Sequence, residues 1–136
     1  MHNLFTYGSL MSSDIMYRVA GCQADFVPAT LKDFQRSRIR GEEYPGIVAH
    51  PGAEVEGILY RDLSPKAIER LDIFEGAQYS RQEVQVMTQH GPCPAMAYVI
   101  RPEYSDLLTG ELWNYSHFLA VGKARFLEAY LGFRKI

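Results

Sequence analysis

The sequence predicts an α+β fold in which a small mixed, mostly antiparallel β-barrel carries flanking helices. Alternating apolar segments come mostly in consecutive runs, whereas a parallel α/β sheet would alternate its strands strictly with helices. Two helical segments interrupt these runs, and the last part of the chain takes up helical spacing. The length of 136 residues corresponds to a single domain, 1–136, with a helical C-terminal extension from about residue 111.

Composition and charge exclude several classes of partner. The hydrophobic fraction of 47% and the charged fraction of 22% are ordinary for a globular protein. The net charge is −2 and the basic residues are scattered, so we expect neither nucleic acid nor a membrane as partner. No apolar run approaches the roughly 18 residues of a membrane helix, and residues 1–5 lack the features of a signal peptide. Two isolated cysteines, Cys22 and Cys93, predict a cytoplasmic protein without a disulfide framework.

The first strand is expected over residues 2–7, where it stops at a glycine turn. Ser12 and Asp14 favour a short helix over about 13–19, because they supply a capping hydroxyl and an acid in the first turn. A strand that ends in such a turn leaves backbone N–H groups free to face an anion. The turn lacks the three glycines of a dinucleotide site and the lysine of a P-loop, so a plain strand-to-helix connection is the alternative.

Further strands are predicted from alternating and β-branched segments. They are expected over 23–39 (as one strand or two), 47–49, 55–63, 79–87 and 95–100. The connections between them are rich in turn-forming residues. We expect a loop over 41–46, a turn over 50–52 and a hairpin connection over 89–94.

The helix expected over 64–75 ends on an unusual residue. Ser64 and Pro65 supply an N-cap hydroxyl and a proline at the first helical position, and Gly76 follows the last turn. The inward face of this helix is apolar until its end, where Glu75 occupies the same register.

A carboxyl group at this position is pushed toward its protonated form by three influences. These are burial, the negative end of the helix dipole, and the charge of Asp72 three residues earlier. Such a group suits general acid–base catalysis near neutral pH. The alternative is that Glu75 rotates into solvent at a frayed helix end.

An aromatic stripe marks the C-terminal third and predicts one or two helices over about 111–130. The residues at near-helical spacing are Trp113, Tyr115, Phe118, Leu119, Gly122, Phe126 and Tyr130. A stripe of this kind packs in a core more often than it binds a cofactor. If the face is exposed instead, it predicts a homodimer through the C-terminal aromatic helices.

Other catalytic arrangements lack the sequence context that they need. The four histidines have no paired spacing and neither cysteine has a C-x-x-C partner, so no metal site is expected. Neither cysteine has a context that lowers a thiol pKa. Ser9 lacks the second glycine of a nucleophile elbow. Glu75 and the glycine turn remain as the candidate site.

Two signatures in this chain resemble those of the γ-glutamylcyclotransferase-like family, also called the avirulence-induced-gene-like family. Phe5-Thr6-Tyr7-Gly8-Ser9-Leu10 resembles its Y-G-S/T-L motif. The second signature joins Gly57-Ile58-Leu59-Tyr60, Leu71-Asp72-Ile73-Phe74-Glu75-Gly76 and Tyr79-Ser80-Arg81. The loop Tyr44-Pro45-Gly46-Ile47 is also similar, and the resemblance covers about residues 4–100 in the family's order.

The resemblance implies an enzyme that cyclises a γ-glutamyl group to 5-oxoproline and releases the attached amine or amino acid. The substrate's α-amine attacks its own γ-carbonyl, so neither a cofactor nor an enzyme nucleophile is implied. Carried over by motif, Glu75 is the general acid–base, and the backbone of the glycine turn holds the substrate's carboxylate. The implied substrate-binding residues are Tyr7, Gly8, Ser9, Leu10, Tyr79 and Tyr98.

The resemblance leaves the leaving group open. Met11 stands where members acting on γ-glutamyl amines typically have a basic residue, and the Asn of the glutathione-degrading branch is absent after the serine. Arg81 is expected to be structural, pairing with Asp72. Two other hypotheses are a non-catalytic binding module for a carboxylate-bearing metabolite, and an interaction protein that presents its C-terminal helices.

Overall fold

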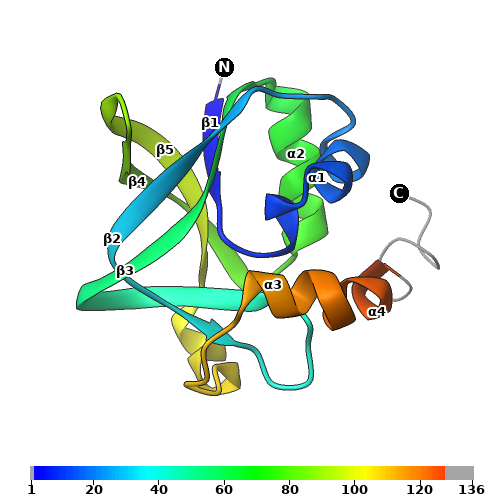
Figure 1. Ribbon diagram of the computed structural model, residues 1–136, viewed down its shortest axis with the longest axis vertical. Helices are drawn as coiled ribbons and strands as arrows, with labels where there is room; N and C mark the ends of the chain where they lie inside the picture. Colours follow the sequence, from blue (N-terminus) through cyan, green and yellow to red (C-terminus); the bar gives the residue numbers. More distant parts are fainter. Residues whose placement is uncertain (1, 128–136) are drawn as a thin grey trace.

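The sheet is a closed five-stranded barrel with the strand order β1–β3–β2–β4–β5 (Figure 1). The computed structural model describes residues 2–127. Its strands are β1 (His2–Thr6), β2 (Phe26–Arg38), β3 (Pro45–Leu63), β4 (Tyr79–Thr88) and β5 (Gly91–Ile100). Neighbours pair antiparallel except β1 and β5, which run parallel and meet at Leu4 and Met96. The predicted fold class, a small mixed and mostly antiparallel barrel with flanking helices, is confirmed.

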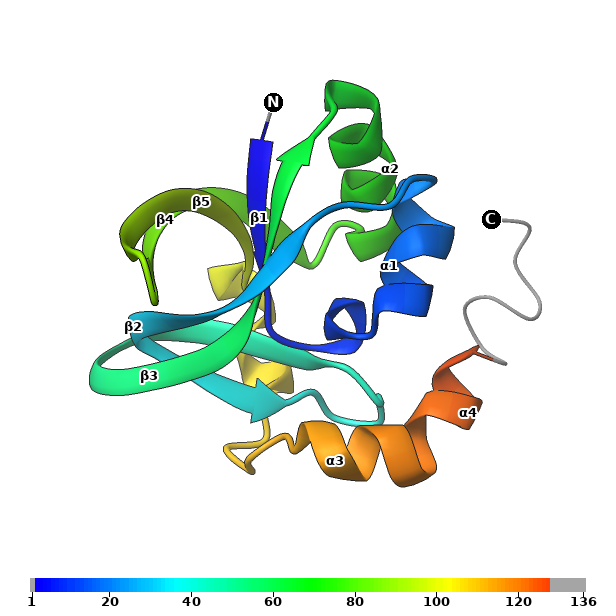
Figure 2. The same ribbon diagram turned by 45° about the horizontal axis from the view of Figure 1, so that its top comes forward.

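Helices cover the barrel from two sides. Figure 2 shows α1 (Ser13–Ala20) and α2 (Pro65–Glu75) side by side against one flank. The C-terminal segment runs as α3 (Tyr115–His117), the π-helical turn η3 (Phe118–Gly122) and α4 (Lys123–Leu127). Short 3-10 helices, η1 (Ser9–Met11) and η2 (Pro102–Leu107), follow β1 and β5. Within residues 2–127, no helix has the length and apolar character needed to cross a membrane.

The core divides into two clusters because consecutive strand residues face opposite sides of the sheet. Phe5 and Leu59 belong to the cluster inside the barrel. Leu4 and Tyr60 belong to the larger cluster between the barrel and its helices. Where a strand lies between the two clusters, as at the end of β1 and the end of β5, both of its faces are buried.

The prediction of two short strands separated by a turn at 50–52 is wrong, because β3 is a single strand that bends. The bend is shared with β2, whose pairing with β3 shifts register between Lys32 and Phe34. Asp33 and Gly52 have φ values of 66° and 87°, and Gly52 N–H donates to Asp33 Oδ1 at 3.0 Å. The predicted turn is thus a bulge in a continuous hairpin.

The predicted hairpin connection over 89–94 is also too long. Only Gln89 and His90 connect β4 to β5, since Thr88 already pairs with Gly91. Pro92 and Pro94 lie inside β5, where they pair with Met87 and Gln85. Prolines alternating along one strand direct their missing N–H groups away from the neighbouring strand, which an edge segment tolerates.

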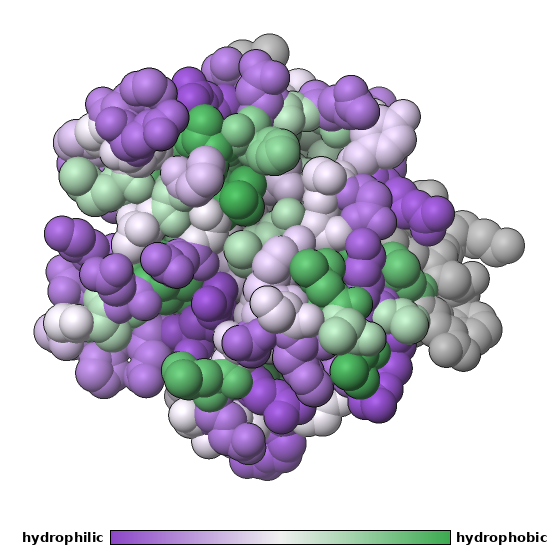
Figure 3. Space-filling view, in the orientation of Figure 1, coloured by the Kyte–Doolittle hydropathy of each residue, from purple (hydrophilic) through white to green (hydrophobic). Residues whose placement is uncertain are grey.

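The C-terminal helices begin at Tyr115 rather than at 111, and Tyr130 lies outside the described residues. Trp113, Phe118 and Phe126 are buried within the chain, which agrees with a packing role for the aromatic stripe. Figure 3 shows hydrophobic side chains on the face that carries this segment, where Leu119 and Val121 are exposed. The homodimer stays a prediction.

Candidate active site

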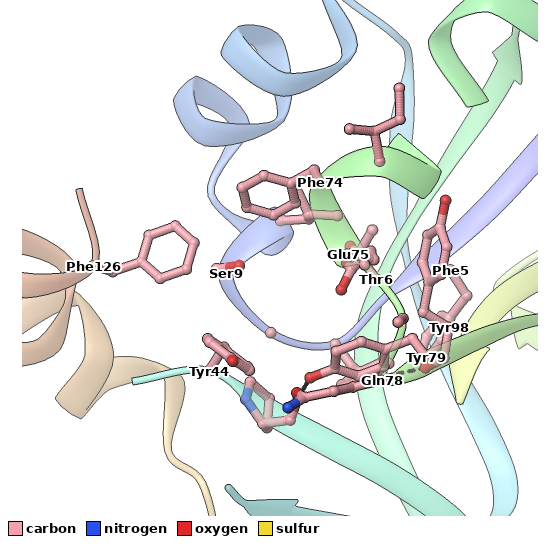
Figure 4. Close-up of a pocket in the computed structure, with 17 residues that line it drawn as sticks. Phe5, Thr6, Ser9, Tyr44, Phe74, Glu75, Gln78, Tyr79, Tyr98 and Phe126 are labelled. Carbon is pink, nitrogen blue, oxygen red and sulfur yellow. Dashed lines mark hydrogen bonds between the residues drawn. The ribbon is translucent and has the colours of Figure 1, made fainter. Parts of the chain in front are cut away.

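The end of β1 and the end of α2 meet at one cavity of about 340 Å³ (Figure 4). This volume lies at the lower end of the ~300–1,000 Å³ typical of small-molecule sites. Every residue that the sequence analysis selected contributes to its wall: Tyr7, Gly8, Ser9, Leu10, Glu75, Tyr79 and Tyr98. The structure therefore brings together two segments that lie more than 60 residues apart in the sequence.

Local signals position Glu75 at the end of α2. Ser64 Oγ accepts a hydrogen bond from Ala67 N–H at 3.1 Å, so the predicted N-cap fixes the start of the helix. Gly76, with φ 81°, ends the helix, and its N–H donates to Asp72 C=O at 3.1 Å. Because both ends are fixed, the last turn directs Glu75 into the cavity and not into open solvent.

Glu75 is partly buried, and its carboxyl group has an unusual acidity. Burial, and to a smaller extent the negative charge of Asp72, together raise the pKa of Glu75 from 4.5 to about 8. A carboxyl with this pKa exchanges a proton readily near neutral pH. Two of the three predicted influences, burial and the Asp72 charge, therefore act on this group.

Asp72 has a different environment on the same turn. Arg81 Nε lies 2.9 Å from Asp72 Oδ1, and Tyr98 O–H donates to the same oxygen at 2.7 Å. The predicted pairing of Arg81 with Asp72 is confirmed. These contacts fix β4 and β5 against the end of α2, and they leave the Glu75 carboxyl facing the cavity.

The glycine turn depends on a close approach between two chain segments. A Cβ at Gly8 would lie 2.6 Å from Pro45 Cδ, so a larger residue would displace the start of β3. Within the turn, Met11 N–H donates to Gly8 C=O and Ser12 N–H donates to Ser9 C=O. The N–H groups before Met11 belong to the first residues of the 3-10 turn. At these positions helical amides have no partner within the helix.

Tyrosine hydroxyls brace the cavity wall. Tyr7 O–H donates to Tyr98 C=O at 2.6 Å, and burial raises the pKa of Tyr7 well above its ordinary value. Tyr79 O–H donates to Pro45 C=O at 2.8 Å. Tyr60 O–H donates to Leu10 C=O at 2.8 Å, which holds the turn from outside the cavity. The phenols thus set the positions of the strands and the turn around the site.

Sequence reasoning missed several residues of the cavity wall. These are Phe5, Thr6, Tyr44, Pro45, Ile73, Phe74, Gly76, Ala77, Gln78 and Phe126. Seven of them lie within two residues of a selected residue, so their proximity in sequence was the available signal, and Tyr44 and Pro45 belong to the loop that the family resemblance covers. Phe126 is different, because only the tertiary packing of the C-terminal helices brings it to the site.

Comparison with known proteins supports one family. The profile described as "Gamma-glutamyl cyclotransferase, AIG2-like" matches residues 4–115. AIG2-like protein A of Arabidopsis thaliana is 30% identical over 96% of this chain and 79% of that protein. AIG2-like protein B from the same plant is 30% identical over 96% of this chain and 76% of its own length.

Solved structures agree with this assignment. An Arabidopsis thaliana protein determined in solution superimposes with a TM-score of 0.73 and 30% identity, over 95% of this chain and 87% of that one. A yeast gamma-glutamyl cyclotransferase specific to glutathione gives a TM-score of 0.63 over 99% and 88% of the two chains. Its 13% identity shows a shared fold alone. The chain therefore belongs to the gamma-glutamyl cyclotransferase, AIG2-like family.

Proposed function

We propose that the protein is a γ-glutamyl cyclotransferase that converts a small γ-glutamyl compound to 5-oxoproline and a free amine or amino acid. The observation that carries the proposal is the Glu75 carboxyl, which faces the cavity with its pKa raised to about 8. Membership of the family and the fold shared with gamma-glutamyl cyclotransferases support the same reaction.

The reaction needs proton transfer and positioning more than a nucleophile from the protein. The α-nitrogen forms a bond to the γ-carbonyl carbon, and the bond from that carbon to the departing nitrogen breaks. The α-nitrogen gives up two protons and the departing nitrogen gains two, so no water is consumed and nothing is oxidised. Glu75 carries these protons one at a time, since its carboxylate takes a proton from the α-nitrogen and its acid form donates one to the departing nitrogen.

Ring closure is intramolecular, so holding the substrate in a folded conformation supplies much of the rate. The backbone N–H groups of Gly8, Ser9 and Leu10 bind the substrate's α-carboxylate, which places the α-amine next to Glu75. Tyr7, Tyr79 and Tyr98 bound this part of the cavity, and their hydrogen-bonded hydroxyls keep its shape.

The test is 5-oxoproline release from a panel of γ-glutamyl amines and dipeptides that includes glutathione. Glu75→Gln keeps the shape of the side chain but carries no exchangeable acid proton, so we expect a loss of at least about 100-fold in kcat. Glu69→Gln is the matched control, since Glu69 lies exposed on the same helix. Turnover that survives in Glu75→Gln would remove the assigned role. Stabilisation by these ligands without product from any of them would support a binding module instead.

A further inference from the structure

The C-terminal segment, which follows the part of the chain matched by the family model, adds an aromatic side to the cavity. Phe126 lies on α4, beyond residue 115 where the family match ends, yet it lines the cavity. In Figure 4, Phe126 lies on one side of Ser9 and Glu75 on the other, with Phe74 above Ser9 and Tyr44 below it. The cavity therefore has an acid–base end and an aromatic end.

The three rings form one packed group. The centroid of Phe126 lies 6.0 Å from that of Phe74 and 6.4 Å from that of Tyr44, with interplanar angles of 67° and 81°. These are edge-to-face arrangements, the geometry that aromatic rings prefer. Ile73 extends the apolar wall outward, since it lines the same cavity and is 73% exposed.

Contacts between the C-terminal segment and the loop before β3 hold Phe126 in place. Trp113 Nε1–H donates to Glu43 C=O at 2.8 Å, and Arg125 Nη1 lies 3.2 Å from Glu43 Oε1. Phe118 packs edge-to-face on Phe126 at 5.8 Å. Phe126 is only 2% exposed, so the core fixes the ring before any ligand enters.

The charged residues of the cavity wall also restrict which leaving group the cavity can accept. Among the described residues that line the cavity, Glu75 is the one acidic side chain, and none is Lys, Arg or His. A carboxylate pushed against the aromatic end would lose its hydration without gaining a cationic partner from those residues, which is costly. An apolar ring would instead displace water from the aromatic end and gain packing contacts.

We infer that the aromatic end is the subsite for the leaving group, and that it selects γ-glutamyl conjugates whose departing amine bears an aromatic ring and no carboxylate. This inference rests on the proposed function, because it assigns the acid–base end to the glutamyl group. Cleavage follows the same steps: the bond from the γ-carbon to the ring-bearing amine breaks, and that amine leaves with the proton from Glu75.

Three substrates separate the contributions of the ring and of the charge. They are the γ-glutamyl conjugates of phenethylamine, of ethylamine and of phenylalanine. We expect kcat/KM for the phenethylamine conjugate to exceed the other two by at least about 10-fold. Removing one methylene group from a substrate that binds in an apolar pocket already changes kcat/KM by about 10–200-fold. A carboxylate that is buried without a partner is disfavoured further.

Phe126→Leu removes the ring while keeping an apolar residue in the core. We expect it to lower kcat/KM for the phenethylamine conjugate by about 10-fold and to change the ethylamine conjugate by less than about threefold. Leu119→Ala is the control, because Leu119 is exposed on the same helical segment. Circular dichroism and thermal melting check that both variants stay folded.

The outcomes separate the two proposals. Release of 5-oxoproline with equal or higher kcat/KM from the ethylamine or phenylalanine conjugate overturns the inference and leaves the proposed function standing. An equal loss for both amine conjugates in folded Phe126→Leu overturns it too, because the ring would then not contact the leaving group. Release from none of the wider panel overturns the proposed function, and the inference with it.

Discussion

Asp72 and Glu75 lie on the same last turn of α2, but Asp72 pairs with a guanidinium and Glu75 faces the cavity. Asp72 contacts Arg81 at 2.9 Å and accepts a hydrogen bond from Tyr98. Glu75 faces the cavity with its pKa raised to about 8 by burial and by the charge of Asp72. A carboxyl whose pKa is raised by burial is a recurring feature of acid–base sites.

The rate of 5-oxoproline release should depend on the ionisation of Glu75. Because its carboxylate form takes the first proton, kcat/KM should rise about tenfold per pH unit below the pKa of about 8 and level off above it. Initial rates measured from about pH 6 to about pH 9.5 give this profile. A profile with its midpoint near the ordinary value of 4.5 would contradict the raised pKa.

Asp72→Asn should shift this profile to lower pH, since it removes the negative charge that raises the pKa of Glu75. Asn keeps an oxygen that can accept the hydrogen bond from Tyr98. The rate at about pH 6.5, relative to the plateau, should rise roughly threefold, the effect of about 0.7 kcal/mol. The substrate's own amine titrates identically with both proteins, so the shift reports the enzyme's group.

Arg81→Gln is the control of opposite sign. Without the guanidinium, the charge of Asp72 is less compensated, so the profile should move to higher pH. A shift in the same direction for both variants would mean that they act by disturbing the end of α2. Charge would then not be the cause.

The stability of Glu75→Gln should differ from that of the wild type only above acidic pH. The folded state binds the Glu75 proton more tightly than the unfolded state does, so wild-type stability falls as pH rises from about 4.5 to about 8. Gln carries no such proton. The variant should therefore be more stable by about 2–4 kcal/mol at about pH 9 and nearly equal at about pH 4.

Urea unfolding at the two pH values measures this difference without reference to any substrate. Glu69→Gln, on the exposed face of α2, should show no comparable dependence on pH. A Glu75→Gln variant less stable than the wild type at both pH values would show that the carboxylate makes favourable contacts in the folded protein.

Sequence reasoning succeeded where structure depends on neighbouring residues. Ser64, Pro65 and Gly76 defined α2 because caps act within one helical turn, and that register placed Glu75 on the inward face. The barrel followed from the order of the strands. Met11 shows the limit of motif reasoning, since the departure from the family motif at this position left the leaving group open.

The errors come from contacts between distant segments. Pro51 and Gly52 usually end a strand, but the pairing of β3 with β2 carries the strand through a shared bulge. Phe126 looked like any core aromatic, because no local pattern indicates that α4 reaches the cavity. In both cases, contacts between residues far apart in the sequence determine the structure.

Gly8→Ala tests whether the close approach of the glycine turn to the start of β3 matters for activity. The new methyl group would lie 2.6 Å from Pro45 Cδ, and Pro45 is anchored through its carbonyl, which accepts from Tyr79 O–H. Because neither segment yields easily, we expect the turn to shift and kcat/KM to fall by about 10–100-fold, as for other misplacements near a reacting centre.

Gly122→Ala is the matched comparison, because its methyl group would lie 2.5 Å from Glu43 Oε2, the end of a flexible side chain. That carboxylate can swing away, at the cost of its ion pair with Arg125, and a partly exposed ion pair of this kind contributes at most about 1 kcal/mol. Gly122→Ala should therefore keep kcat/KM for the ethylamine conjugate within about threefold of the wild type. Equal losses in the two variants would attribute the effect of Gly8→Ala to general destabilisation. A loss confined to Gly8→Ala, with both variants folded, would assign the turn to the part of the cavity that positions the glutamyl group.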